Sequence, residues 1–85
     1  MQLTKIQLAE FEERGFLHFP NLLSADEVAP LQAALPEIFA RQGPEIIREA
    51  ESDAARLAFG AHTYSEPFRQ LSLLPRLLNP VQQLL

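Results

Sequence analysis

The sequence contains no cysteine and no tryptophan, and only three of its 85 residues are glycine. Without cysteine, neither a disulfide framework nor a thiolate zinc site can compensate for a small hydrophobic core. Three glycines and seven basic residues also fall short of a Gly-rich phosphate loop or a basic groove. The sequence therefore contains no nucleophile motif and no phosphate-binding loop.

Positive charge is scarce as well, because 7 Lys and Arg stand against 11 Asp and Glu, which gives a net charge of −4. Binding to phosphate backbones needs clustered basic residues, so we expect no nucleic-acid partner. No apolar run approaches the ~20 residues of a membrane span. The N-terminal residues also lack the apolar stretch of a secretory signal. We expect a cytoplasmic protein with no membrane partner.

The composition, 47% hydrophobic and 21% charged, is that of an ordinary globular sequence, so some packed core should form. The length is near the lower end of the single-domain range, where only roughly 60–65% of the unfolded surface is buried. A complete enzyme is not expected at this size.

Local signals predict two helices in the first half of the chain. Thr4 with Gln7, and Ser24 with Glu27, have the spacing of capping boxes, which predicts helices that begin at residues 5 and 25. Gly15 stands where a left-handed residue in a Schellman cap would end the first helix at residue 14.

Proline interrupts the patterns that follow. Residues 16–19 form a short aromatic-rich run closed by Pro20, which is typical of a strand. Pro30 and Pro36 each remove a backbone donor from the second helix, so we expect a kink or a break before it ends near residues 43–44.

The second half of the chain allows two structures for residues 45–59. Their apolar spacing favours a helix, whereas a turn at residues 51–53 would favour a hairpin. Beyond this segment, Ser65 can cap a short helix with Pro67 in its first turn, and Pro75 can open another.

Four segments carry recognisable motifs: residues 3–16, 19–28, 61–69 and 75–85. The third has the pattern His-x-Tyr-Ser-x-Pro-Phe, which is more specific than the helix-Gly-aromatic-Pro pattern of the opening. Together these segments resemble the start of a phytanoyl-CoA dioxygenase family protein, in particular the ectoine hydroxylase-like members.

The resemblance implies an α+β fragment over residues 1–85: N-terminal helices, a short strand and a β-hairpin that flank a double-stranded β-helix (jelly-roll) core absent from this chain. For residues 45–59 the resemblance therefore favours the hairpin over the helix, since tertiary context overrides helix propensities of roughly 0–0.7 kcal/mol per residue. For the full-length protein it implies an Fe(II)- and 2-oxoglutarate-dependent dioxygenase that hydroxylates a small organic substrate. We expect the isolated chain to be inactive.

The iron ligands of such enzymes, a His-x-Asp or His-x-Glu and a distal His, are not found in the sequence. His18 is followed two positions on by Pro20, and His62 by Tyr64. The alternative is a metal site in which the two histidines meet Asp53 in space. It is disfavoured because metal sites also need an oriented second layer of partners. We expect no metal, no catalytic residue and no bound cofactor in this chain alone.

The resemblance brings His62 and Tyr64 toward the substrate or cosubstrate pocket of the full enzyme. The alternative for His62 is a loop histidine with local hydrogen bonds. For His18 we expect a strand residue at the rim of the core.

Arg48 and Arg56 are further pocket candidates, because they would face each other across the hairpin and could bind a carboxylate in a bidentate manner. The alternative is that they are solvated and pair with Glu49 or Glu51.

A second class of function is a small non-catalytic helical module. Its apolar C-terminal stretch, residues 71–85, would dock on a partner chain or on itself.

We predict that the isolated chain binds ferrous iron no better than a generic two-histidine peptide and shows no oxygenase activity, because it lacks the carboxylate partner of either histidine. Isothermal titration calorimetry under anaerobic conditions checks this. A tight, stoichiometric iron site that His62→Ala abolishes would contradict it.

Overall fold

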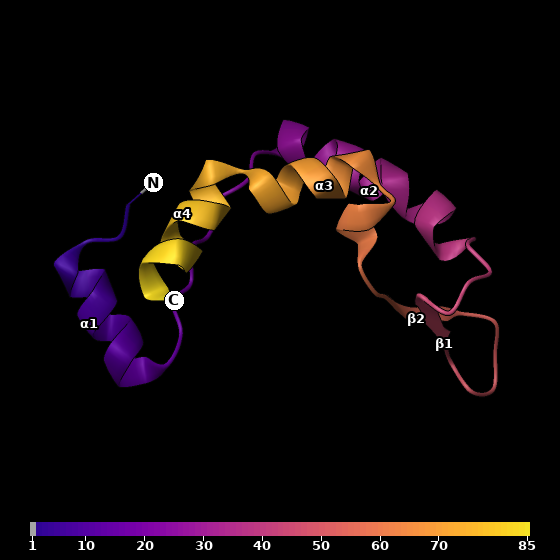
Figure 1. Ribbon diagram of the computed structural model, residues 1–85, viewed down its shortest axis with the longest axis horizontal. Helices are drawn as coiled ribbons and strands as arrows, with labels where there is room; N and C mark the ends of the chain where they lie inside the picture. Colours follow the sequence, from indigo (N-terminus) through magenta and orange to yellow (C-terminus); the bar gives the residue numbers. More distant parts are fainter. Residues whose placement is uncertain (1) are drawn as a thin grey trace.

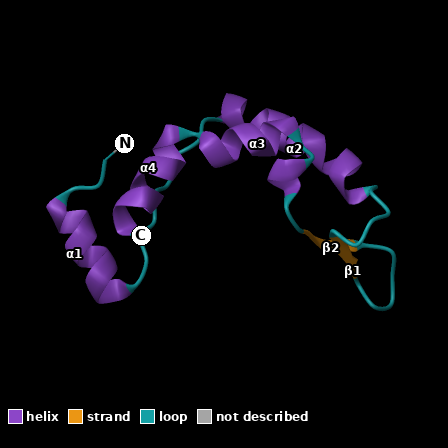
Figure 2. Ribbon diagram, viewed as in Figure 1, coloured by secondary structure: helices purple, strands orange, loops and turns teal. Residues whose placement is uncertain are grey.

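The computed structural model describes residues 2–85, which form an arch (Figure 1). Four α-helices, a 3-10 helix and a two-stranded sheet make up this part of the chain (Figure 2). In order they are α1 (Lys5–Arg14), α2 (Ala25–Phe39), β1 (Ile46–Arg48), β2 (Ala55–Ala58), η1 (Ala61–Thr63), α3 (Glu66–Leu73) and α4 (Pro75–Leu84).

The arch has α1 and α4 at one end, α2 beside α3 along its span, and the hairpin of β1 and β2 at the other end (Figure 1). Its radius of gyration is 16.0 Å, whereas a compact domain of this length has about 12 Å. Its accessible surface is 6535 Å², about 1,400 Å² more than the size of the chain predicts for a folded monomer. The α+β class is confirmed, but the shape is open.

The core is correspondingly small. Among the described residues, the buried hydrophobic side chains are Leu3, Ile38 and Ile46. The aromatic side chains contribute less than a globular composition suggests, because Phe16 and Phe59 are largely exposed. The expected packed core therefore forms only as separate patches at the two ends of the arch.

Both predicted capping boxes are confirmed. The backbone N–H of Gln7 donates to the Thr4 hydroxyl over 3.1 Å, and that of Glu27 donates to the Ser24 hydroxyl over the same distance. The backbone N–H of each cap residue also donates the reciprocal bond, over 2.9 Å, to the side chain three residues on. The helices begin at residues 5 and 25 because these bonds satisfy their free amide groups.

Gly15 ends α1 in the left-handed conformation, with φ 81°, as predicted. The predicted Schellman cap is wrong in detail. The Gly15 N–H donates to the Phe11 carbonyl over 2.7 Å, which is the single bond of the simpler left-handed cap. The Arg14 guanidinium lies over the Phe16 ring, 4.5 Å from the centre of the ring.

We predicted a kink or a break in α2, and the break does not occur, because one helix runs through both Pro30 and Pro36. It ends at Phe39, four residues before Gly43, and not near residues 43–44 as predicted. The carbonyl of Pro36 still accepts the Ala40 N–H over 3.1 Å, so the last turn closes despite the proline.

The predicted strand at residues 16–19 is also wrong. In residues 2–85 the sheet consists of β1 and β2 alone, so this extended run has no ladder partner. Asn21, with φ 59°, turns the chain immediately afterwards. His18 is consequently an exposed loop residue, not a residue at the rim of a core.

The hairpin at residues 45–59 is confirmed, and the helix that the local pattern favours is not formed. Its strands pair Ile46 with Ala58 and Ile47 with Leu57, but the next pair is Arg48 with Ala55. Arg56 is thus the extra residue of a β-bulge. The expectation that Arg48 and Arg56 face each other is wrong, although they do lie on neighbouring strands.

Polar bonds over long sequence separations hold the other end together. The Gln83 side-chain amide bonds both backbone groups of Leu3, accepting from its N–H over 2.8 Å and donating to its carbonyl over 3.0 Å. Arg76 donates to the Leu22 carbonyl over 2.7 Å and forms an ion pair with Glu27. These contacts fix α4 against the first segment of the chain and the start of α2.

We predict that Gly15→Val destabilises the fold by about 1–2 kcal/mol, because a β-branched residue is strained at positive φ. A Cβ at Gly15 would meet no atom within 4 Å, so the cost is conformational and not steric. Gly15→Asn, the matched control, should retain most of the stability. Urea unfolding followed by circular dichroism measures both, and equal losses would contradict the left-handed cap.

Candidate functional site

The Arg48 guanidinium forms hydrogen bonds with backbone carbonyls. One terminal nitrogen, Nη2, donates to the carbonyls of Phe39 and Arg41 over 2.8 and 2.9 Å, and Nη1 donates to the carbonyl of Asp53 over 3.0 Å. The Asp53 carboxylate lies 3.8 Å from Nε. Arg48 therefore caps the C-terminus of α2 and the hairpin loop at once, where a cation is favoured by the helix dipole. The alternative pairing with Glu49 or Glu51 is wrong for this residue.

Arg56, by contrast, is exposed at the bulge and forms no ion pair within residues 2–85. A bulge re-aims the side chain that it carries. Of the two arginines, Arg56 is the one whose guanidinium is free to bind a carboxylate from outside.

Tyr64 is also held in place. Its hydroxyl donates to the Phe59 carbonyl over 3.1 Å, and its ring lies 3.9 Å beneath the Arg41 guanidinium. Arg41 in turn donates to Glu45 over 2.8 Å. A hydrogen bond from its own backbone N–H, together with Arg41, keeps the pKa of Glu45 below its ordinary value. Tyr64 thus joins the end of the hairpin to the loop before it.

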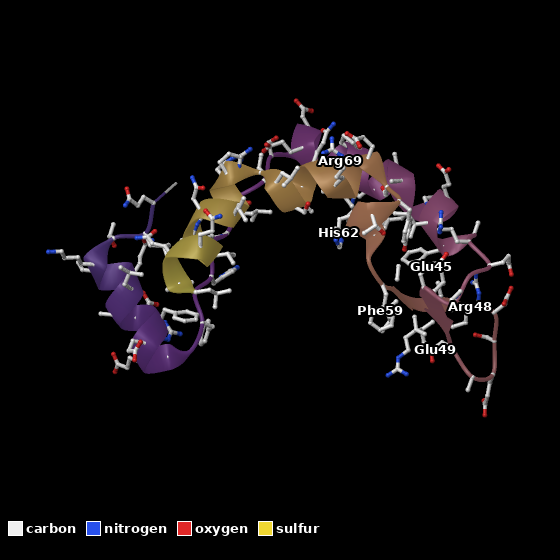
Figure 3. All side chains as sticks on the ribbon, viewed as in Figure 1. Glu45, Arg48, Glu49, Phe59, His62 and Arg69 are labelled. Carbon is white, nitrogen blue, oxygen red and sulfur yellow. The ribbon has the colours of Figure 1, made fainter. Side chains whose placement is uncertain are left out.

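His62 is exposed on η1 and points into the inside of the arch (Figure 3). It lines an open hollow of about 450 Å³ formed mainly by apolar side chains of α3 and α4. The hollow's other lining residues include Phe68, Leu71, Leu78 and Val81. His62 is therefore a polar group at the edge of an apolar surface.

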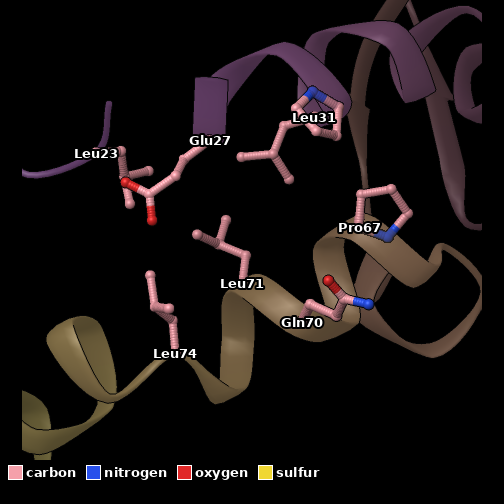
Figure 4. Close-up of a pocket in the computed structure, with 8 residues that line it drawn as sticks. Leu23, Glu27, Leu31, Pro67, Gln70, Leu71 and Leu74 are labelled. Atoms are coloured by element: carbon pink, nitrogen blue, oxygen red, sulfur yellow. The ribbon is translucent and has the colours of Figure 1, made fainter. Parts of the chain in front are cut away.

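A second hollow, of about 190 Å³, lies between α2 and α3 (Figure 4). Its lining is mostly leucine and proline, and its carboxylate, Glu27, is already paired with Arg76. This hollow has no free reactive group, so we assign it no chemistry.

The first turn of α3 carries a charge pair that the sequence reading missed. Arg69 donates to Glu66 through two nitrogens, over 2.7 and 2.6 Å, and Gln70 adds a third bond over 3.2 Å. Arg69, then Gln70, lower the pKa of Glu66 to about 2. The spacing of three and four residues on a helix was the signal that could have identified this pair.

The described residues do not fit an iron site. No group of three or more His, Asp or Glu side chains in this part of the chain lies close enough to hold a metal ion. His18 lies in the loop after α1, whereas His62 lies on η1, in a different part of the arch.

None of the helices within residues 2–85 has the length and apolar character to cross a membrane.

Comparison with known proteins identifies the family of the chain. The family model described as phytanoyl-CoA dioxygenase (PhyH) matches residues 11–85. The chain belongs to the phytanoyl-CoA dioxygenase family.

Curated relatives agree with this membership. The chain is 35% identical over 71 residues to the L-proline trans-4-hydroxylase of Streptomyces griseoviridis, covering 84% of this chain and 26% of that protein. It is 40% identical over 68 residues to the ectoine dioxygenase of Stutzerimonas stutzeri, covering 73% and 22%. The Bordetella parapertussis ectoine dioxygenase is 37% identical over 89 residues, covering 98% and 28%. This family member spans about a quarter of the length of these relatives.

We predict that Arg48→Lys destabilises the hairpin by about 1–2 kcal/mol, because a single ammonium cannot serve the three carbonyls that the guanidinium bonds. Hydrogen exchange at the Glu49 and Phe59 amides, which bond across the hairpin, measures the change. Arg56→Lys is the matched control and should leave exchange at both amides unchanged. If the two variants behave alike, Arg48 does not act as a clamp.

Proposed function

We propose that this chain is the N-terminal part of an Fe(II)- and 2-oxoglutarate-dependent dioxygenase that hydroxylates a small organic molecule. The observation that carries the proposal is the family match over residues 11–85, with relatives named for ectoine and proline. Iron and 2-oxoglutarate would be held by the three-quarters of the domain that these 85 residues do not include. When bound, they would supply the oxidising chemistry.

Within this chain we assign His62 and Arg56 to the pocket side. Both are exposed, and His62 points toward the inside of the arch (Figure 3). A neutral imidazole can accept or donate a hydrogen bond, and a guanidinium can bind a carboxylate. Both suit a small polar substrate or a dicarboxylate cosubstrate.

Arg48 and Tyr64 act in this proposal by position. Arg48 donates to the carbonyls of Phe39 and Arg41, at and just after the end of α2. Tyr64 donates to the Phe59 carbonyl at the end of the hairpin, so together the two residues hold the hairpin in place. A misplacement of about 1 Å can cost on the order of a hundredfold in rate, so such supports matter for catalysis.

A second candidate function is docking through residues 71–85 as a non-catalytic module. Leu73, Val81 and Leu85 are exposed in this stretch, which favours contact with a partner chain or a second copy. The dioxygenase proposal accounts for the same surface, because the rest of the domain would cover it.

The proposal is tested with a chimera of the Stutzerimonas stutzeri ectoine dioxygenase in which this chain replaces the segment it matches. We predict that the chimera turns over ectoine and that the 85-residue chain alone does not. His62→Ala in the chimera should lower kcat/KM by about tenfold or more, because a pocket contact is lost.

His18→Ala is the matched control, since His18 is an exposed loop histidine distant in sequence from η1. It should change kcat/KM by less than about twofold. A folded chimera without turnover would refute the proposed function, and equal effects of the two substitutions would refute the role of His62.

A further inference from the structure

Two of the three residue pairs of the hairpin are apolar, and these two lie on opposite faces. Directly paired residues of antiparallel strands share a face, so Ile46 and Ala58 lie on one side and Ile47 and Leu57 on the other. The first side packs toward α2, and Ile46 is 7% exposed. On the second side, Ile47 and Leu57 are each 37% exposed.

Phe59 extends the uncovered side. It is two residues beyond Leu57 and therefore projects from the same face of the extended chain. Its side chain is 60% exposed and points away from Arg48 and the end of α2, toward the inside of the arch (Figure 3). The exposed apolar residues of this side are Ile47, Leu57 and Phe59, which we call the outer hairpin face.

An exposed apolar face of this kind is unusual for a sheet in a complete folded domain. A sheet with one solvated side alternates apolar and polar residues, whereas one that is apolar on both sides is covered on both. A two-stranded hairpin is also marginal in water unless a further layer packs on it. The sequence of the hairpin is therefore suited to a second covering layer opposite α2.

The amount of surface indicates a large partner. The chain exposes about 1,400 Å² beyond what a compact monomer of its mass exposes, and one side of a standard protein interface takes about 800 Å². The relatives contain roughly three times as much additional sequence as this chain covers. The rest of a family domain is thus large enough to fill the arch.

We propose that the outer hairpin face is an interface covered by an apolar surface of the remainder of a phytanoyl-CoA dioxygenase domain. This inference rests on the proposed function. It assigns the second side of the hairpin, in addition to the side on α2, to the interior of the complete domain.

The absence of cysteine from this chain makes the test direct, because an introduced thiol reports the accessibility of one position. Ile47→Cys and Phe59→Cys place probes on both strands of the outer hairpin face. Ser52→Cys, in the exposed turn of the same hairpin, is the matched control. Each is made in the isolated chain and in the ectoine dioxygenase chimera, and the chimera without an added cysteine gives the background of maleimide labelling.

We expect labelling at positions 47 and 59 to slow by about tenfold or more in the chimera relative to the isolated chain, because burial makes reaction depend on local opening. The Ser52→Cys rate should be the same in both. Hydrogen exchange at the Phe59 amide, measured in the chain and in the chimera without an added cysteine, gives a second measurement should a cysteine variant fail to fold.

Unchanged labelling at both face positions in an active chimera overturns the inference and leaves the proposed function intact. Protection in a folded but inactive chimera supports the interface while the proposed function fails. If the isolated chain sediments as a dimer with both face positions already protected, a second copy covers the face and the inference is wrong.

Discussion

The contact between Glu27 and Arg76 is the constraint on which the arch depends. The Glu27 carboxylate accepts the Ser24 N–H as part of the α2 cap and also binds Arg76, which additionally donates to the Leu22 carbonyl. One charged pair thus sets where α2 begins and where α4 lies against it. Both side chains are about one-third exposed, so the pair contributes chiefly geometry, because partly solvated ion pairs add little net free energy.

Arg48 has the corresponding role at the opposite end. The last carbonyls of a helix have no intrahelical partner, and here the Phe39 carbonyl at the end of α2 accepts from a residue of the hairpin, as does the Arg41 carbonyl two residues on. The helix can therefore stop at Phe39 without a glycine, and the hairpin is fixed by the same bonds. Each end of the arch is held by an arginine that joins segments by binding backbone carbonyls.

Local chemistry was enough to predict where the helices begin, although Ser65 precedes α3 without forming a side-chain cap bond. Capping boxes, the left-handed Gly15 and Pro75 act within a few residues, and each is present as predicted. The strand at residues 16–19 could not be judged in this way, because a strand exists only if another segment bonds to it. The end of α2 likewise depended on Arg48, nine residues after Phe39.

The hairpin shows the same division between local and distant information. Apolar spacing at residues 45–59 favoured a helix, and only the family resemblance indicated strands. Neither the apolar spacing nor the family resemblance could predict the one-residue register shift between Ile47 and Arg48. This shift decides which arginine binds carbonyls and which is free. For the candidate site, residue types were predictable, whereas their engagement by backbone groups far along the chain was not.

The bonds between Leu3 and Gln83 also bear on how the arch assembles. These residues are 80 positions apart, so Leu3 can gain both bonds only after the residues of α4 have been synthesised. Contacts between distant residues form slowly because a long loop must close first. During translation, α1 would therefore emerge with its own caps in place but without its final neighbour, and the arch would close at this end only after α4 has left the ribosome.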